Sequence, residues 1–379
     1  MRATKRTILL NPGPATTTDS VKLAQVVPDI CPREREFGLL MANVCEELTR
    51  LAADPDRYTA VLFGGSGTAA VESILSSVVD DGTVVIINNG AYGRRMCEIA
   101  DAYGLRYFEV KSPPDEMIDL EALETVIRNN DKISHLAIVH HETTTGLLND
   151  IHAVGALCKL HGIDMIVDAM SSFAAVPIDM QQMNISYLAS SSNKNLQGMP
   201  GVSFVIAEKR KLELTQHLRR RNYYLNLYDQ YAYFVKHLQM RFTPPVQTLY
   251  ALKQAIEELK QEGIPGRYGR YVESWETLIR GITRLGLSFI VPESLHSKIV
   301  TAIVEPDCSG YDFEAMHDYF YSHNIMIYPG KLDGLKTFRI ANMGDIRSED
   351  IEHFVGLLEA YLRSIGFNKG EGDDGRAEY

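Results

Sequence analysis

Residues 58–79 read YTAVLFGGSGTAAVESILSSVV, an apolar run followed by a glycine-rich turn and then a helical pattern. An apolar run of this length bounded by glycine predicts a buried strand, and the residues after the turn have the spacing of a helix. Further apolar runs at 83–88, 105–110, 133–140 and 164–169 alternate with helical patterns in the same way. This alternation predicts βαβ units, a mostly parallel sheet buried on both faces, and a site at the carboxyl ends of its strands.

The pattern changes in the second half of the chain. Apolar runs at 185–190 and 201–207 predict two more strands, but after about residue 245 long helical segments and shorter strands follow, ending in a helix over 348–366. We therefore predict an α/β fold with an N-terminal segment near the site (1–20), a large α/β domain (21–245), a smaller α+β C-terminal domain (246–366) and a polar, disordered tail (367–379).

The composition narrows the class of protein. The 379 residues are 45% hydrophobic and 23% charged with a net charge of −11, which is typical of a globular protein. Basic residues cluster only in HLRRRNYY at 217–224, so nucleic acid is not an expected partner. No apolar run reaches the roughly 18 residues of a membrane span, and Asn-Pro-Gly-Pro at 11–14 interrupts any signal-peptide core. We expect a cytoplasmic protein that does not bind membranes.

Cysteine and histidine spacing indicates neither disulfides nor a metal site. The five cysteines are far apart and lack the CxxC spacing, so we expect reduced, mostly buried thiols. The His-His-Glu run at 140–142 is adjacent in sequence, and in an extended segment its side chains alternate between faces. No metal is therefore expected.

The glycine turn has the geometry that binds a phosphate, because a turn before a helix directs backbone N–H groups and the positive helix end at one point. Gly65, Gly67 and Ala70 match the dinucleotide pattern G-x-G-x-x-A, but the second strand ends in Asn-Asn-Gly without the acidic residue that NAD binding requires. A Walker loop is excluded because no Gly-Lys-Ser/Thr follows. The remaining interpretations are a monophosphate site with Ser66, Gly67 and Thr68 as donors, or a purely structural turn.

Two charged residues follow apolar strands. Asp168 ends the run DMIVD at 164–168, and Lys194 lies in the loop SSSNKNLQGMPG at 190–201. A carboxylate at the end of a buried strand is costly unless a cation or hydrogen-bond donor meets it, although a helix N-cap before residues 171–173 is the structural alternative. In a cleft, desolvation would lower the pKa of the lysine and make it a nucleophile, whereas a solvated loop lysine is the alternative.

A phosphate site, a carboxylate and a loop lysine together fit pyridoxal 5′-phosphate. This cofactor needs an anchored phosphate, a carboxylate that keeps its pyridine nitrogen protonated, and a lysine that binds its aldehyde. Asp168 and Lys194 supply the last two groups. Tyr92, on the loop after the second strand, can stack on the ring.

At these residues the chain resembles the class V branch of the fold-type I pyridoxal-phosphate aminotransferases. The resemblance covers residues 7–366 and rests on the motifs LLNPGPA, CPREREFG, FGGSGTAAVES, HHETTTGLLND, VDAMSSFAA, SSSNKNLQGMPGVSF and FRIANMGD. It implies a fold-type I large domain with a mostly parallel, seven-stranded type of sheet, a homodimer and transaminase activity. Together these motifs are specific for the family.

The resemblance also implies roles for individual residues. Lys194 would bind the cofactor aldehyde and Asp168 the pyridine nitrogen, and these two are the expected catalytic residues. The expected remaining contacts to the cofactor are Ser66, Gly67, Thr68 and Asn193 at the phosphate, Thr145 near the ring hydroxyl and, from the neighbouring subunit, Thr243. Arg339 would bind the acidic end of the substrates.

The residues themselves also indicate that Arg339 binds an acid. It ends a strand of the second domain, where its planar fork could bind a carboxylate or phosphonate over the cleft. A surface arginine in a short strand is the alternative. Pro32-Arg33 stands where related alanine–glyoxylate enzymes tend to have His-Arg, which favours the phosphonate branch of the family. The substrates implied are 2-aminoethylphosphonate and pyruvate.

Two other functions stay open on the sequence. An alanine– or serine–glyoxylate type of class V aminotransferase would have the same cofactor but a carboxylate-bearing donor. A non-catalytic phosphate- or cofactor-binding protein is compatible with the glycine turn alone, although Lys194 and Asp168 count against it.

Overall fold

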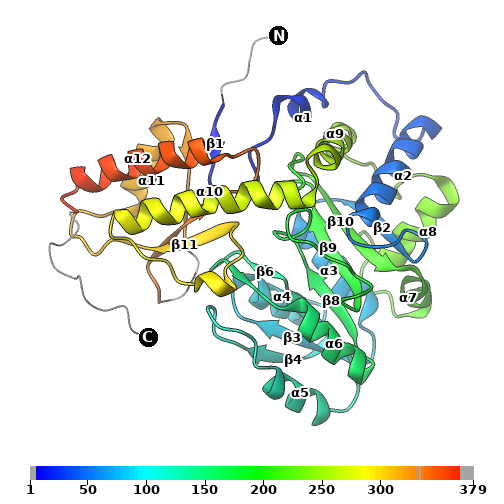
Figure 1. Cartoon of the computed structure of the whole chain (residues 1–379). Coiled ribbons are helices and arrows are strands. Elements are labelled where there is room, and N and C mark those ends of the chain that lie inside the picture. Colours follow the sequence, from blue (N-terminus) through cyan, green and yellow to red (C-terminus); the bar gives the residue numbers. More distant parts are fainter. Residues whose placement is uncertain (1–5, 331, 333, 368–379) are drawn as a thin grey trace.

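The structure, a computed structural model, describes residues 6–330, 332 and 334–367. A seven-stranded sheet with helices on both faces forms the larger part of the molecule (Figure 1). In spatial order its strands are β2 (Tyr58–Gly64), β10 (Val202–Glu208), β9 (Ile185–Ser191), β8 (Asp164–Asp168), β5 (Ile133–Val139), β3 (Thr83–Asn88) and β4 (Arg106–Lys111). Strand β10 runs in the direction opposite to that of the other six strands. The predicted α/β fold with a mostly parallel sheet is confirmed.

Alternating side chains of each strand enter two separate cores. In β10, Phe204 and Ile206 face one core, whereas Val205 and Ala207 face the other. This alternation follows from the pleat, and it requires strands that are apolar at every position because helices cover both faces. One face carries α2 (Arg35–Arg50), α5 (Leu120–Arg128), α6 (Ile151–His161) and α9 (Val246–Glu262). The other carries α3 (Gly67–Val78), α4 (Ala91–Ala102), α7 (Lys209–Leu214) and α8 (Leu227–His237).

Strand β4 differs from the prediction that the strands are buried on both faces. Arg106, Phe108 and Glu109 are exposed. The reason is its position at the edge of the sheet, where β3 is its only neighbour. Charged side chains on an edge strand also discourage pairing with another chain.

The second part of the molecule has an α+β architecture, as predicted. Its sheet has the antiparallel order β11–β14–β13. The strands are β11 (Val300–Val304), β13 (Tyr328–Pro329) and β14 (Thr337–Ala341), and the helices are α10 (Ile264–Arg284), η2 (Glu293–Leu295), α11 (Phe313–Ser322) and α12 (Ser348–Ser364). Helix α10 runs from the large part into this one (Figure 1). The domain boundaries at residues 20, 245 and 366 stay predictions, and 368–379 of the predicted tail lie outside the described residues.

The N-terminal segment joins the two parts. Strand β1 (Ile8–Leu9) pairs in parallel with β12 (Ile325–Met326) of the second part. From there the chain passes to the large part, where the Ala15 N–H donates to the Asn193 carbonyl at 2.9 Å, and it continues into α1 (Asp19–Leu23). The segment therefore crosses the loop that carries Lys194.

Two further findings concern the class of protein. None of the helices in the described part of the chain is long and apolar enough to span a membrane. All five cysteines are free thiols, of which Cys45, Cys97 and Cys158 are buried. This confirms the expectation of unpaired, mostly buried thiols.

Candidate active site

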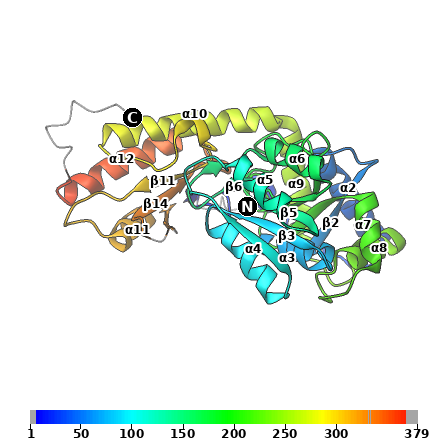
Figure 2. The ribbon, with the colours of Figure 1, turned by 90° about the horizontal axis from the view of Figure 1, so that it is seen from below.

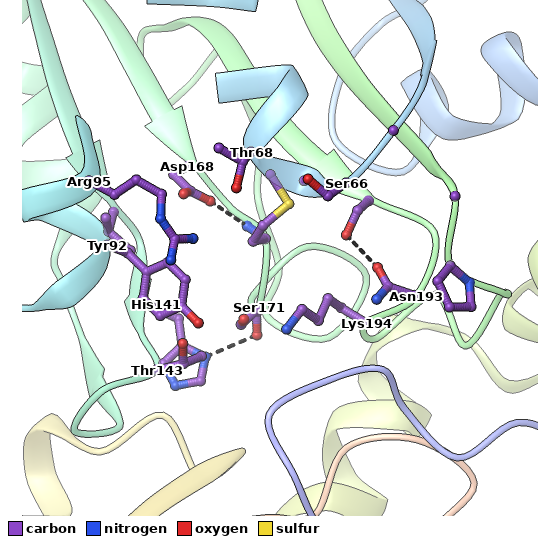
Figure 3. A pocket seen from close by; sticks show the side chains of 17 residues that line it. Ser66, Thr68, Tyr92, Arg95, His141, Thr143, Asp168, Ser171, Asn193 and Lys194 are labelled. Atoms are coloured by element: carbon purple, nitrogen blue, oxygen red, sulfur yellow. Dashed lines mark hydrogen bonds between the residues drawn. The ribbon is translucent and has the colours of Figure 1, made fainter. Parts of the chain in front are cut away.

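A cavity of about 470 Å³ lies at the carboxyl ends of the parallel strands, as predicted (Figure 3). Its volume lies in the range of small-molecule sites. It is lined by Gly65, Ser66, Gly67, Thr68, Tyr92, Arg95, Val139, His141, Thr143, Asp168, Met170, Ser171, Ser191, Asn193, Lys194, Pro200 and Gly201. Seven of the predicted site residues are among them, namely Ser66, Gly67, Thr68, Tyr92, Asp168, Asn193 and Lys194.

The glycine turn leads from β2 into α3 at one end of this cavity. Ser66 is the N-cap of α3, and its side chain makes no capping bond in the structure. The first-turn N–H groups of a helix have no partner within the helix, so those of Gly67 and Thr68 can bind an anion. A Cβ at Gly67 would clash with Sδ of Met170, so a larger residue at this position would require the Met170 side chain to move. The N–H of Gly65 is bonded to the Gly201 carbonyl at 2.9 Å and does not face a ligand.

Asp168 ends β8 and is 6% exposed. Its Oδ1 accepts the Met170 N–H at 2.9 Å, so one carboxylate oxygen caps the following turn. The sequence left a helix N-cap as the structural alternative, but the residues after Asp168 form a turn and not a helix. Burial raises the pKa of Asp168 to about 6, the Met170 N–H opposes this, and the nearby Glu142 adds to it. A cationic partner in the cavity would lower this pKa again, because it stabilises the charged form.

Lys194 lies in the turn between β9 and β10 and reaches the N-terminal segment. Its Nζ donates to the Pro12 carbonyl. A Cβ at Gly13, where φ is +110°, would lie 2.6 Å from Cδ of the lysine, so the close approach requires glycine. Asn193 beside it accepts the Ser191 hydroxyl at 2.9 Å through Oδ1, which leaves its Nδ2 group to donate elsewhere.

One wall of the cavity follows a period of two that the sequence analysis did not use. Val139, His141 and Thr143 line the cavity because alternate residues of an extended segment share one face. The alternation ends in the turn where the Thr145 N–H donates to the carbonyl of residue 142. Thr145 does not line the cavity, and its Oγ1 accepts the Leu147 N–H at 3.3 Å.

Tyr92 lies at the start of α4, one residue into the helix, whereas the sequence placed it on the preceding loop. Arg95 follows it by three residues on the same helical face and also lines the cavity. The guanidinium carbon of Arg95 lies 4.8 Å from the centre of the Tyr92 ring. The i, i+3 spacing from Tyr92 could have identified Arg95 in the sequence as a second residue of the cavity.

Arg339 is buried in the middle of β14, and this corrects the expectation that it ends a strand. Its Nε donates to the Pro329 carbonyl at 3.0 Å, and one Nη donates to the Thr143 carbonyl at 3.3 Å. Burial lowers the pKa of Arg339, and the neighbouring Tyr92 opposes this. Arg339 does not line the cavity but contacts Thr143, which does.

Thr243 is exposed and lies outside the cavity. Its segment passes beside the glycine turn, because Pro245 lies next to Gly64. The Tyr224 hydroxyl donates to the carbonyl of the same glycine at 3.3 Å. Arg33 fixes the start of the segment by donating to the carbonyls of residues 240 and 241. Arg33 therefore has a structural role.

The structure also bears on the expectation that no metal is bound. Within residues 6–367, apart from the two gaps, no group of three or more His, Cys, Asp or Glu side chains is placed to hold a metal ion. Glu142 instead accepts the N–H groups of Thr144 and Tyr92 at 3.1 and 3.2 Å.

Comparison with known proteins agrees with this arrangement. Residues 25–316 match the model of the aminotransferase class-V family. The chain belongs to the class-V aminotransferases. It is 40% identical over 356 residues to the 2-aminoethylphosphonate–pyruvate transaminase of Vibrio vulnificus, covering 93% of this chain and 96% of that protein. It is 36% identical to the Phocaeicola vulgatus protein of the same name, covering 94% and 99%.

Solved structures of two other aminotransferases have the same fold. The alanine–glyoxylate aminotransferase of Nostoc superposes with a TM-score of 0.88 at 29% identity, covering 96% of this chain and 97% of that one. The ureidoglycine–glyoxylate aminotransferase of Bacillus subtilis gives 0.88 at 23% identity, which shows the fold alone.

The cofactor of class-V aminotransferases is pyridoxal 5′-phosphate, and the cavity fits it. The N-terminal end of α3, the carboxylate of Asp168 and the amine of Lys194 could bind its phosphate, ring nitrogen and aldehyde. The Tyr92 ring supplies an aromatic surface. One cavity therefore contains groups that could bind the phosphate, the ring nitrogen and the aldehyde of the cofactor, whereas Thr145, expected near the ring hydroxyl, does not line it.

Buried histidines make the stability of this aminotransferase depend on pH. Burial lowers the pKa values of His140, His141 and His296 to about 3, 4 and 3. Because the folded-state values lie below the unfolded value near 6.5, their contribution to stability is present above pH 6.5 and is lost as the pH falls towards 3. We expect the free energy of unfolding to fall by up to about 4 kcal/mol per pH unit, since each histidine contributes at most about 1.4.

Urea unfolding of the apoprotein between pH 7 and pH 5 measures this slope. Replacing the buried His140 by glutamine should reduce the slope, whereas His353→Gln, at an exposed position, should leave it unchanged. A stability that does not vary with pH over this range would contradict the prediction.

Proposed function

We propose that this aminotransferase transfers the amino group of 2-aminoethylphosphonate to pyruvate, giving phosphonoacetaldehyde and L-alanine. The observation that carries the proposal is the identity of 36–40% over nearly the full length to proteins named 2-aminoethylphosphonate–pyruvate transaminase. Pro32-Arg33 supports the same branch.

We propose the following roles for the residues that hold the cofactor. Ser66, Gly67, Thr68 and Asn193 bind its phosphate, Tyr92 stacks on its ring, Asp168 binds its pyridine nitrogen, Thr145 lies near its ring hydroxyl and Lys194 binds its aldehyde. The bound cofactor supplies an aldehyde that takes up the amino group and a ring that withdraws electrons. Because Thr145 lies behind the wall formed by Thr143, its contact to the ring hydroxyl requires a small rearrangement or an indirect bond.

The protein moves the protons. Nζ of Lys194 takes the proton from the donor carbon that bears the amino group, and in the second half of the cycle it returns a proton to the corresponding carbon of the acceptor. Asp168 stays ionised and keeps a proton on the ring nitrogen. Arg339 holds the phosphonate of the donor and the carboxylate of the acceptor in turn, so donor and acceptor use the same site one after the other.

A glyoxylate-type class-V aminotransferase is the second candidate. The observation that favours it is the superposition on the Nostoc alanine–glyoxylate enzyme, at 29% identity. A non-catalytic phosphate-binding protein does not account for the full-length similarity to transaminases.

A half-reaction tests the proposal. We would follow the absorption of the cofactor-loaded enzyme without oxygen after adding 2-aminoethylphosphonate alone, and then pyruvate. The absorption band of the bound cofactor is expected to disappear with the donor and to return with pyruvate. No change with the phosphonate, but loss of the band with alanine or serine, would assign the chain to the glyoxylate type.

Arg339→Lys is expected to raise KM for both 2-aminoethylphosphonate and pyruvate by at least about tenfold. An ammonium cannot reproduce the planar fork, and a charge-assisted hydrogen bond contributes about 1.5–3 kcal/mol. Steady-state kinetics with each substrate measure the effect. Arg284→Lys, on the surface beside Glu359, is the matched control. An unchanged KM for pyruvate would place the acid site at another residue.

We also propose that the enzyme is a homodimer in the cytoplasm. Thr243 is exposed beside the glycine turn, and Tyr223 and Tyr224 next to it are 73% and 42% exposed, which is typical of an interaction surface. The five free thiols are compatible with a reducing compartment. Sedimentation equilibrium tests whether the enzyme is a dimer. A monomer with full activity would contradict the expected contact between Thr243 and the cofactor of the neighbouring subunit.

A further inference from the structure

We propose that Ser297 is a positioning residue of the active site: its hydroxyl, which comes from the C-terminal part, holds the imidazole of His141 in one tautomer and one orientation at the wall of the cavity. The proposal rests on the proposed binding of the cofactor in this cavity. It goes beyond the residues that hold the cofactor, because Ser297 lies behind the wall and acts through His141.

The tautomer of His141 follows from its hydrogen-bond partners. Nδ1 lies 3.0 Å from the Ser171 carbonyl oxygen, and a carbonyl only accepts, so Nδ1 carries the hydrogen. Nε2 lies 2.8 Å from Oγ of Ser297. Burial lowers the pKa of His141 to about 4, so the ring is neutral at pH 7 and Nε2 has a free electron pair. The Ser297 hydroxyl must therefore donate to Nε2.

Ser297 is itself held firmly, which gives its hydroxyl a fixed direction. It is fully buried, and its N–H donates to the Gly146 carbonyl at 2.8 Å. Its Oγ accepts the Ile299 N–H at 3.3 Å, and its carbonyl accepts the Tyr268 hydroxyl at 3.3 Å. With Oγ already an acceptor, the hydroxyl hydrogen is left for His141.

The same region of the C-terminal part holds the whole hairpin that carries His141. Strand β6 (His141–Glu142), which pairs with β7 (Leu147–Leu148), lies between the large sheet and β11 (Figure 2). Leu147 forms a β-bridge with His296, and Arg339 donates to the Thr143 carbonyl at 3.3 Å. His141 thus links the cavity to the second part of the molecule by a direct hydrogen bond.

Removal of the hydroxyl has a specific consequence. In Ser297→Ala, Nε2 of His141 becomes a buried acceptor without a partner, which is costly. The ring is then free to rotate or to exchange tautomers. The part of the cavity wall that His141 forms near Lys194 (Figure 3) then no longer has one fixed arrangement. A residue with only a packing role would lower stability but would not change the protonation of the His141 nitrogens.

The test measures the His141 nitrogens directly. In cofactor-loaded enzyme with ¹⁵N-labelled histidine, long-range NMR spectra distinguish a protonated from an unprotonated ring nitrogen, and His141→Gln identifies the signals. Wild-type enzyme should show Nδ1–H with a bare Nε2. Ser297→Ala should lose this pattern and reduce kcat about tenfold. Ser297→Thr, which keeps the hydroxyl, should restore both.

Ser274→Ala is the matched control, since the buried Ser274 hydroxyl has no hydrogen-bond partner among the described residues. It should change neither the spectrum nor kcat. An Nε2–H tautomer in the wild-type enzyme would overturn the proposal even if Ser297→Ala does not fold, and so would a Ser297→Ala enzyme with the wild-type spectrum and kcat. The NMR result needs no substrate, and kcat can be measured with whichever donor reacts, so a wrong substrate assignment is distinguishable.

Discussion

Lys194→Ala is expected to reduce turnover by about four orders of magnitude or more, because the variant loses both the amine that binds the cofactor aldehyde and the base that moves the proton. Treatment with borohydride followed by mass spectrometry should find no cofactor on the protein chain, whereas the wild-type enzyme should carry it at Lys194. Substrate binding should change less than kcat, since the anion site is separate from the lysine.

Lys209→Ala is a matched control for this variant. Nζ of Lys209 also donates to a proline carbonyl, that of Pro55, at 2.7 Å, but it lies outside the cavity. This control should keep full activity. Turnover by Lys194→Ala within about tenfold of wild type would contradict the assignment of the lysine.

Asp168→Ala is expected to reduce kcat by two to four orders of magnitude, roughly the range seen for single acid–base groups, even when the cofactor is bound. Without the carboxylate, the ring nitrogen loses the partner that keeps it protonated, and the ring withdraws electrons less well. Measurements at saturating cofactor separate this effect from weaker binding. Asp168→Asn keeps the shape and the bond to the Met170 N–H, so a similar loss in that variant would assign the effect to the charge.

The control for Asp168 lies at the other end of the same strand. Asp164 begins β8 and is paired with Lys211, far from the cavity. Asp164→Ala should lower stability through the lost ion pair but should keep kcat. Normal kcat in Asp168→Ala would show that another group binds the ring nitrogen.

The positions of the main site residues could be predicted because they depend on local patterns. A glycine turn after a buried strand, a carboxylate at a strand end and a lysine in a short loop are all placed by the rule that the carboxyl ends of parallel strands meet at one edge. Asp168, Lys194 and Gly67 follow from that rule, and the structure brings them into one cavity.

Residues whose position depends on tertiary contacts could not be predicted in the same way. Thr145 follows Thr143 within one sequence motif, which suggests that both lie on the same side of the cavity. The turn at residues 142–146 instead directs Thr145 away from the face that Thr143 occupies. Arg339 is in the middle of its strand, because β11 and β13 extend the pairing on both sides of it.

Ser297 shows the same limit more strongly. Nothing near it in the sequence marks it as part of the site, since it reaches His141 only through the packing of the second part against the β6–β7 hairpin. By contrast, Val139, His141 and Thr143 follow an alternation that is visible in the sequence, so this wall could have been found.

The pairing of β1 with β12 has a consequence for biosynthesis. Residues 8–9 are translated long before residues 325–326, with which they pair, and the Leu10 N–H also donates to the Met326 carbonyl at 2.9 Å. A nascent chain that has emerged as far as residue 300 contains every strand of the large sheet, yet its leading segment has no strand to join. Because domains generally fold as units in the order of synthesis, the segment that crosses Lys194 is placed late. We therefore expect cofactor loading to follow translation of residues 325–326.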